Sequence, residues 1–260
     1  MKNIRIGSYQ WMQATNGQLS FKEKIKLIQK IMMPSILSSI KINYYRFQTG
    51  NDFDIGQIVI PDTQMIKIAL EELESKASIS IYNHSWRTYF WGAALGHLQN
   101  RQFDPESLLL ASLFHDIGLT EQHMHSKGCQ CFTYESAKQF EQKAKEYNFD
   151  DKKSEVIKDA ICLHMNGYIE DSDPSEIILL QQGASCDVIS DNQYKLPLSF
   201  RNEILEKYPR NQFNKEFIKL INLERKKVPS SRTGLLYDLG LPLMMALLHK
   251  AFEGKVFLSC

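Results

Sequence analysis

Hydrophobic residues recur at helical spacing along most of the chain after about residue 60, and short polar breaks separate the segments. Steps of three and four residues place side chains on one face of an α-helix, whereas side chains in strands alternate with a period of two. We therefore predict an all-α domain over residues 61–228. Residues 1–60 are expected to form a helical extension and a loop, and residues 229–260 a C-terminal segment that packs on the domain.

The N-terminal region carries a weaker pattern. Residues 21–42 have a helical pattern that Pro34 interrupts, and Gly, Asn, Asp and Pro within residues 48–62 are typical of a loop. The apolar stretch at residues 31–40 is about half the roughly 20 residues that a membrane-spanning helix needs. Residues 1–17 lack the apolar region of a secretory signal. We expect no transmembrane segment, and a helix packed on the domain rather than peripheral membrane contact.

Composition narrows the possible partners and the compartment. The 31 Lys and Arg residues against 30 Asp and Glu residues give a formal charge of +1, so no global basic character favours nucleic acid as a partner. The five cysteines are odd in number and lack the regular spacing of a disulfide scaffold, which favours a reducing, cytoplasmic location. A small-molecule substrate is the expected partner, and a homo-oligomer is possible.

Two predicted helices carry ionisable side chains. One directs His84 inward, and the other ends at His115 and Asp116. His84 shares a stripe with the apolar residues at 81, 91, 95 and 98. Asp104 followed by Pro105 is a good helix start, because the aspartate can cap the first turn and the proline suits it. The apolar run SLLLASLF then leads to His115 and Asp116 at the far end, with Gly118 as the expected stop.

Two later segments repeat this arrangement. His164 follows residues 157, 160 and 161 at helical spacing, and Asp187 follows residues 180, 183 and 184. Burying an ionised carboxylate among small apolar residues costs several kcal/mol unless a partner or a metal compensates the charge. Taken alone, an inward histidine is more often a hydrogen-bonded core residue than a ligand. Asp187 is the residue that an ordinary core role explains least well, because its neighbours on the helix face are small or apolar.

Two histidines and two aspartates from separate helices form a set that a divalent cation would stabilise. Neutral imidazole and carboxylate together suit Zn, Mn or Fe, and a site of this composition can leave a position open for water. Such an ion lowers the pKa of water towards neutrality and so creates a nucleophile. Spacing alone leaves the choice between a metal site and separate core residues open.

Four sequence motifs resemble the HD-domain superfamily in order and separation, and in detail the branch that contains cyanamide hydratase. They are YNHSWRTYFWG (82–92), LLLASLFHDIGLT (108–120), AICLHMNG (160–167) and QQGASCDVIS (181–190). The resemblance covers about residues 60–228, including YPR at 208–210. It implies an HD-domain helical bundle with a metal site in the core, preceded here by an N-terminal helical extension.

Carried over by position, the resemblance implies that His84, His115, Asp116 and Asp187 are metal ligands. The chain lacks the extra histidines of a fully ligated two-metal site, so we expect one divalent ion. The resemblance also implies a catalytic role for Asp116 and for His164, which is expected to touch substrate or to shuttle a proton. Arg87, one turn after His84, is expected to face the substrate or to form a helix-surface ion pair.

Glu135 opens a helix with an apolar stripe at residues 137, 140, 144 and 147. The resemblance places it close to the site, where it would orient a ligand from outside the metal shell. The alternative is that it complements the helix dipole.

A competing metal cluster is possible at His123, His125, Cys129 and Cys131. Neither pair has the separation usual in structural zinc sites, so we interpret this stretch as a variable loop beside the active site. His97 and His249 have no evident partner and are assigned structural roles.

These observations predict a metal-dependent hydrolase or hydratase that acts on a small polar substrate. Hydration of a nitrile-like carbon, as in cyanamide hydratase, and hydrolysis of a phosphate ester both fit, because a fold does not fix a substrate. The alternative is a non-catalytic HD-fold module that binds a ligand or regulates a partner.

Overall fold

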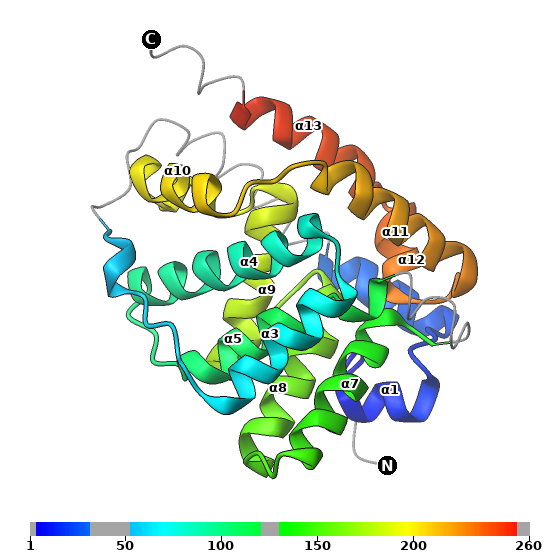
Figure 1. The fold of residues 1–260 in the computed structure, drawn as a ribbon. Helices are drawn as coiled ribbons and strands as arrows, with labels where there is room; N and C mark the ends of the chain where they lie inside the picture. The colour runs from blue at the N-terminus through cyan, green and yellow to red at the C-terminus, as the bar shows by residue number, and fades with distance from the viewer. Residues whose placement is uncertain (1–3, 32–52, 121–129, 254–260) are drawn as a thin grey trace.

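The protein is a helical bundle in the computed structural model, which describes residues 4–31, 53–120 and 130–253, with side chains as far as residue 247 (Figure 1). The described residues contain no strand, so the prediction of an all-α fold is confirmed. Residues 21–31 are helical. The other α-helices are α1 (Tyr9–Thr15), α3 (Gln64–Lys76), α4 (Ile79–Leu98), α5 (Pro105–Phe114), α7 (Phe132–Glu146), α8 (Asp151–Leu163), α9 (Ser175–Ile189), α10 (Leu198–Lys207), α11 (Phe213–Lys227), α12 (Arg232–Asp238) and α13 (Leu241–Glu253).

Helices α4, α5, α8 and α9 form the centre of the bundle, with α3 and α7 packed outside them (Figure 1). Helix α5 is buried from Ser107 to Phe114, as its almost uniformly apolar sequence predicts. Two glycines allow α4 and α9 to pack closely. A Cβ atom on Gly183 would lie 2.2 Å from the carbonyl oxygen of Thr88, and one on Gly92 would lie 2.6 Å from that of Leu179. The two helices that carry His84 and Asp187 are therefore held in close contact.

The start of α5 agrees with the sequence, but its end does not. The Asp104 side chain accepts a hydrogen bond from the Ser107 amide, and Pro105 occupies the first turn. The helix ends at Phe114 rather than at Gly118, which lies in the short 3-10 helix Ile117–Leu119. Gly118 allows close packing instead, because a Cβ there would lie 2.2 Å from the carbonyl oxygen of Phe132 on α7. His115 and Asp116 thus occupy the turn between two helical segments.

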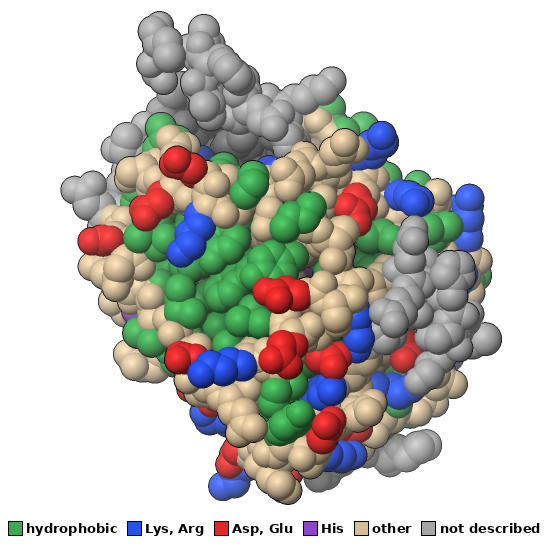
Figure 2. Space-filling model, in the orientation of Figure 1, with side chains coloured by type: hydrophobic (Ala, Val, Ile, Leu, Met, Phe, Trp, Pro, Cys, Tyr) green, Lys and Arg blue, Asp and Glu red, His purple; other side chains and the backbone are tan. Residues whose placement is uncertain are grey.

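The terminal segments pack against the same bundle. Helix α1 contacts α7 and α8, and α12 contacts α11 and the 3-10 helix His164–Asn166. In the part of the chain that the structure describes, no helix combines the length and apolar character needed to cross a bilayer. Figure 2 shows hydrophobic side chains gathered in a shallow hollow over α3 and α4, with charged side chains along its border.

Candidate metal centre

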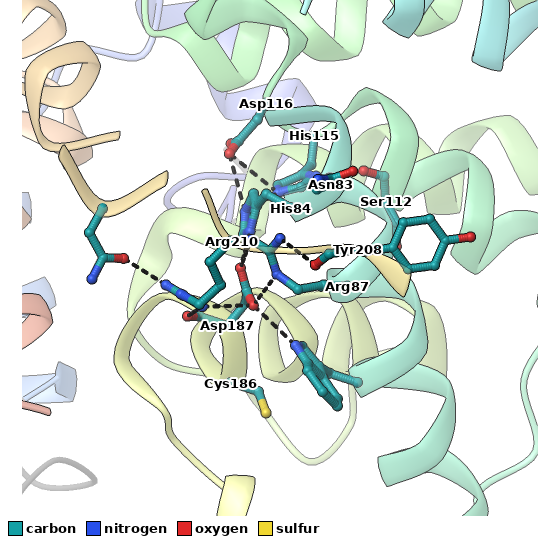
Figure 3. A network of polar contacts seen from close by, with 12 residues as sticks. Asn83, His84, Arg87, Ser112, His115, Asp116, Cys186, Asp187, Tyr208 and Arg210 are labelled. Atoms are coloured by element: carbon teal, nitrogen blue, oxygen red, sulfur yellow. Dashed lines mark hydrogen bonds and ion pairs between the residues drawn. The ribbon is translucent and has the colours of Figure 1, made fainter. Parts of the chain in front are cut away.

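His84, His115 and Asp116 come together in the core, from α4 and from the turn that follows α5 (Figure 3). The two Nε2 atoms of the histidines are 3.1 Å apart. Oδ2 of Asp116 lies 3.4 Å from Nε2 of His84 and 3.5 Å from Nε2 of His115. All three residues are at most 1% exposed. Their ligand-type atoms therefore form a small buried triangle.

Hydrogen bonds on the far side of each ring fix how the histidines face this triangle. Nδ1 of His115 lies 2.7 Å from the carbonyl oxygen of Ser112, so this nitrogen carries the proton and donates it. Nδ1 of His84 lies 2.7 Å from Oδ2 of Asp187 and donates in the same way. A carbonyl or carboxylate in this position fixes the tautomer and leaves the Nε2 lone pair for a metal. Both rings are thus oriented as metal ligands.

Asp116 is the carboxylate of this group, and neither of its oxygens has a hydrogen-bond partner among the described residues. Its contacts with the histidines are 3.4–3.6 Å long, which exceeds hydrogen-bond distance. Burial opposes ionisation of Asp116, but His115, His164 and His84 outweigh it and lower the pKa of the carboxyl group. The result is a buried anion without a donor, which is the situation that a cation would relieve.

The two histidines differ in protonation. Burial lowers the pKa of His115 to about 3, so its ring is neutral at physiological pH. Burial also acts to lower the pKa of His84, but Asp116 and Asp187 on its two sides outweigh burial and raise that pKa. A second proton on Nε2 of His84 competes with a metal for the same lone pair, so metal binding should release a proton.

The donor set and its spacing fit a divalent transition metal. Nitrogen and oxygen ligands lie about 2.0–2.2 Å from a tetrahedral zinc ion, which places them roughly 3.3–3.6 Å from one another. The three distances of the triangle, 3.1, 3.4 and 3.5 Å, are close to this spacing. His84, His115 and Asp116 could therefore hold one ion without rearrangement of the helices.

His164 borders the triangle on the side of Asp116. Nε2 of His164 is 3.6 Å from Oδ1 of Asp116, and Nδ1 lies 2.7 Å from the carbonyl oxygen of Ile161. His164 is 7% exposed, whereas His115 is fully buried and His84 is 1% exposed. Of these three histidines, His164 thus retains the most contact with solvent.

Asp187 is buried, as its neighbours on α9 predict, but it lies beside Nδ1 of His84 rather than beside Nε2. Its oxygens also accept hydrogen bonds from Arg87, Arg210 and Nε1 of Trp91. Burial acts to raise the pKa of Asp187, but Arg87, Arg210 and His84 outweigh it and keep that pKa well below the usual range. The structure groups His84, His115 and Asp116 as potential ligands. Asp187 accepts a hydrogen bond from Nδ1 of His84, on the side of the ring that faces away from the other two.

Arg87 is fully buried, and all three of its nitrogens are engaged. Nε and Nη2 donate to Asp187 at 2.7 and 2.8 Å, and Nη1 donates to the carbonyl oxygens of Tyr208 and Pro209. Asn83 also donates to the carbonyl oxygen of Pro209. Arg87 therefore fastens α9 and the segment after α10 to α4, and its side chain does not face open space.

Glu135 lies in the first turn of α7, as expected, and is 8% exposed. Nζ of Lys138 is 3.6 Å from its Oε1 atom, which has no hydrogen-bond partner in the described part of the chain. Ala137, Phe140 and Ala144 form the buried stripe of this helix. The expectation for residue 147 is wrong, because Tyr147 follows the end of α7 and is 40% exposed.

Of the remaining candidate ligands, the structure describes the side chains of His97 and Cys131. His97 is exposed near the end of α4, where it contacts the rings of Phe53 and Phe103. The possible cluster at 123–131 falls mostly outside the described residues, although Cys131 is described as a buried free thiol. The side chain of His249 also lies outside them.

Three residues beside the cluster were not predicted. Arg210 donates to Asp187, Trp91 donates to the same carboxylate, and Phe213 stacks on the ring of His84 at 4.4 Å between centroids. Arg210 belongs to the YPR motif, which is the one sequence signal that points to it. The other two have ordinary apolar spacing.

Comparison with known families agrees with this geometry. The family model of the HD domain matches residues 81–190, which run from α4 to the end of α9 and include all of His84, His115, Asp116, His164 and Asp187. No curated protein matches the chain. Residues 81–190 therefore form an HD domain, with a buried His/Asp group in its core.

Proposed function

We propose that the protein is a metal-dependent hydrolase or hydratase that acts on a small polar substrate at the His84, His115 and Asp116 cluster. One observation carries this proposal. Two histidine Nε2 atoms and an unpartnered, buried carboxylate converge within 3.5 Å of one another. A single Zn, Fe or Mn ion is the cofactor that this donor set favours.

A divalent ion bound there supplies Lewis acidity, which makes water a competent nucleophile near neutral pH. Side chains of the protein hold the ion and transfer the proton. Asp116 would hold the ion together with His84 and His115, and its second oxygen, which has no hydrogen-bond partner among the described residues, would accept a hydrogen bond from the water. His164 accepts a proton on Nε2, because Nδ1 is already engaged by the carbonyl oxygen of Ile161. The proton then passes from His164 to the product.

The surroundings favour an uncharged substrate, such as a nitrile. Arg87 and Arg210 border the cluster, but both donate to Asp187. Phe213 and Phe217 lie against His84, and Phe132 lies against His164, at centroid distances of 4.4, 6.0 and 5.8 Å. Aromatic neighbours suit a small neutral molecule better than a dianion. Hydration of a nitrile carbon is also the reaction of the cyanamide hydratase branch that the motifs resemble.

Hydrolysis of a phosphate ester is the second candidate. HD domains are typically metal-dependent phosphohydrolases. The guanidinium groups of Arg87 and Arg210 lie on the Asp187 side of His84, and cationic groups near a site attract an anionic substrate. The two candidates therefore make opposite predictions about substrate charge.

The test uses full-length protein that is stripped of metal and reloaded with one ion at a time. We expect turnover of cyanamide or of a member of a phosphate-ester panel. His164→Gln should lower kcat by about 10²–10⁴-fold at unchanged metal content, as expected for loss of a proton-transfer group. His97→Gln, at the far end of α4, is the matched control and should have no effect.

The result that overturns the proposal is a failure to bind metal. Protein that binds none of the three ions stoichiometrically would instead be a non-catalytic module that uses the HD fold to bind a ligand or a partner.

A further inference from the structure

Arg232 is a buried cation outside the metal cluster, and the proposed chemistry does not use it. It begins α12 and is 1% exposed. No carboxylate among the described residues pairs with its guanidinium group. A buried charge is costly unless polar groups compensate it, so the contacts of Arg232 indicate what it stabilises.

Those contacts lie on both sides of His164. Nη1 of Arg232 donates to the carbonyl oxygen of Cys162 at 2.6 Å and also to Oδ1 of Asn166. Nη2 donates to Oγ1 of Thr133 on α7 at 2.8 Å. Cys162 and Asn166 are each two residues from His164, in opposite directions along the chain.

The carbonyl of Cys162 belongs to the last turn of α8, which ends at Leu163. Carbonyls in a last helical turn lack a partner within the helix and lie at the negative end of its dipole. A guanidinium group there caps the helix and is itself compensated by the dipole. The chain then continues as a 3-10 turn, in which Met165 departs from helical angles and Gly167 has φ of 73°. Arg232 thus lies where α8 stops and His164 begins the turn.

The N-terminal segment also contacts Asn166 and Arg232. Asn166 donates through Nδ2 to the carbonyl oxygen of Ile6 at 2.9 Å. Gly7 approaches so closely that a Cβ atom would lie 2.1 Å from Oδ1 of Asn166 and 2.4 Å from Nη1 of Arg232. The turn that bears His164 is therefore fixed by residues from both ends of the described chain.

We propose that Arg232 is a positioning residue for His164: its two hydrogen bonds from Nη1, to Cys162 and Asn166, fix the turn so that the Nε2 atom of His164 faces Asp116. This inference rests on the proposed function for its catalytic meaning. The positioning itself does not depend on which substrate the protein uses. Lysine cannot replace arginine here, because its single ammonium nitrogen cannot take the places of both Nη1, which bonds Cys162 and Asn166, and Nη2, which bonds Thr133.

The test is nitrogen NMR of the histidine rings in zinc-loaded protein, with the His164 signal assigned by its loss in His164→Gln. In the wild type we expect a single Nδ1–H tautomer for His164 and for His115. In Arg232→Lys the His164 signal should broaden or show a mixture of tautomers, whereas His115, held by Ser112, should not change. In the same variant kcat should fall about 10- to 100-fold while metal content stays constant, the range typical of lost outer-shell support.

Arg225→Met is the matched control. It removes the contact between Arg225 on α11 and Asp238 on α12 without touching the turn, so the His164 signal and kcat should match the wild type. If Arg232→Lys does not fold, Asn166→Ala removes the hydrogen bond from Arg232 to Asn166 and should alter the His164 signal in the same direction.

A folded Arg232→Lys, or Asn166→Ala in its place, with an unchanged His164 signal would overturn the inference. If the His164 signal changes in a protein that turns over neither cyanamide nor phosphate esters, the positioning stands and the proposed function fails.

Discussion

The Nε2 atoms of His84 and His115 face each other at 3.1 Å, and the Nδ1 atom of each ring is engaged by a separate acceptor. When both rings are neutral, two lone pairs point at the same space, which also borders the carboxylate of Asp116. Lone pairs and an anion repel one another unless a positive charge lies between them. A proton on His84 supplies part of that charge, and a divalent cation would supply more.

Zinc should stabilise the wild-type protein, and Asp116→Asn should remove most of this effect. An amide in place of the carboxylate keeps the shape of the side chain but removes the negative charge from the ligand set. At zinc concentrations about 100 times the dissociation constant, binding contributes about 2.7 kcal/mol to the free energy of unfolding of the wild type. We expect zinc affinity to fall more than 100-fold in the variant, since a lost ligand should exceed the 10- to 100-fold effect of outer-shell partners. Thermal unfolding with and without zinc measures both.

Asp159→Asn is the control for this experiment. Asp159 is also a mostly buried carboxylate, but it accepts a hydrogen bond from the amide of Tyr9 rather than facing the cluster. It should keep the full response to zinc. A full zinc response in Asp116→Asn would mean that the metal binds elsewhere.

Asp187→Asn should destabilise the protein whether or not metal is present. The substitution leaves the fully buried Arg87 without its carboxylate, and loss of one partner from a buried ion pair costs about 3–5 kcal/mol. Metal affinity should fall by about 10–100-fold, because Asp187 orients His84 from behind. Denaturant unfolding in chelator and a competition titration with zinc separate the two effects.

The size of the affinity loss distinguishes an outer role for Asp187 from the direct ligation that the resemblance to HD domains implies. A loss as large as that of Asp116→Asn would support direct ligation. Asp62→Asn is the control for unfolding, because it breaks an exposed ion pair with Lys67 and should change stability little.

The sequence predicts the all-α class and the burial of the site residues, although not every helix end. Helical spacing correctly places His84 and Asp187 on buried faces, since each shares a stripe with small or apolar neighbours. The capped start of α5 is also correct, because the cap depends on Asp104 and the residues immediately after it.

Periodicity does not predict how two buried faces meet. It places Asp187 inward but does not show that it lies on the Nδ1 side of His84, because that depends on the close crossing of α4 and α9. Arg210 and Arg232 act from outside the helices that carry the histidines, and their contacts span 23 residues to Asp187 and 70 residues to Cys162. No local pattern encodes such contacts.

Gly183→Ala tests whether the close crossing of α4 and α9 maintains the site. The added methyl group would lie 2.2 Å from the carbonyl oxygen of Thr88 and 3.0 Å from the amide of Gly92, so the helices must separate. We expect a loss of about 2–3 kcal/mol in the free energy of unfolding. Zinc affinity should also fall, because the shift moves Asp187 away from His84. Gly56→Ala is the control, since its new Cβ would meet nothing closer than 3.4 Å; an equal loss in both variants would contradict this explanation.

Glu224 should make the protein less stable as the pH rises from about 4.5 to 7. This side chain on α11 is 4% exposed and accepts a hydrogen bond from the amide of Phe132 at the start of α7. Burial raises its pKa to about 7, from an ordinary value of 4.5. Between these values the folded protein binds a proton that the unfolded chain has released, so the free energy of unfolding falls with increasing pH and then levels off above pH 7. The total change from this group is about 3 kcal/mol.

Glu224→Gln should remove this dependence, because glutamine keeps an acceptor for the Phe132 amide and carries no charge. The variant should match the wild type near pH 4.5 and exceed its stability by about 2–3 kcal/mol at pH 8. Denaturant unfolding at several pH values, with the exposed Glu203→Gln as control, gives the difference directly and cancels the titration of other groups. A wild type that is as stable as the variant at pH 8 would show that Glu224 ionises without penalty, and that its contact with the start of α7 compensates its burial in full.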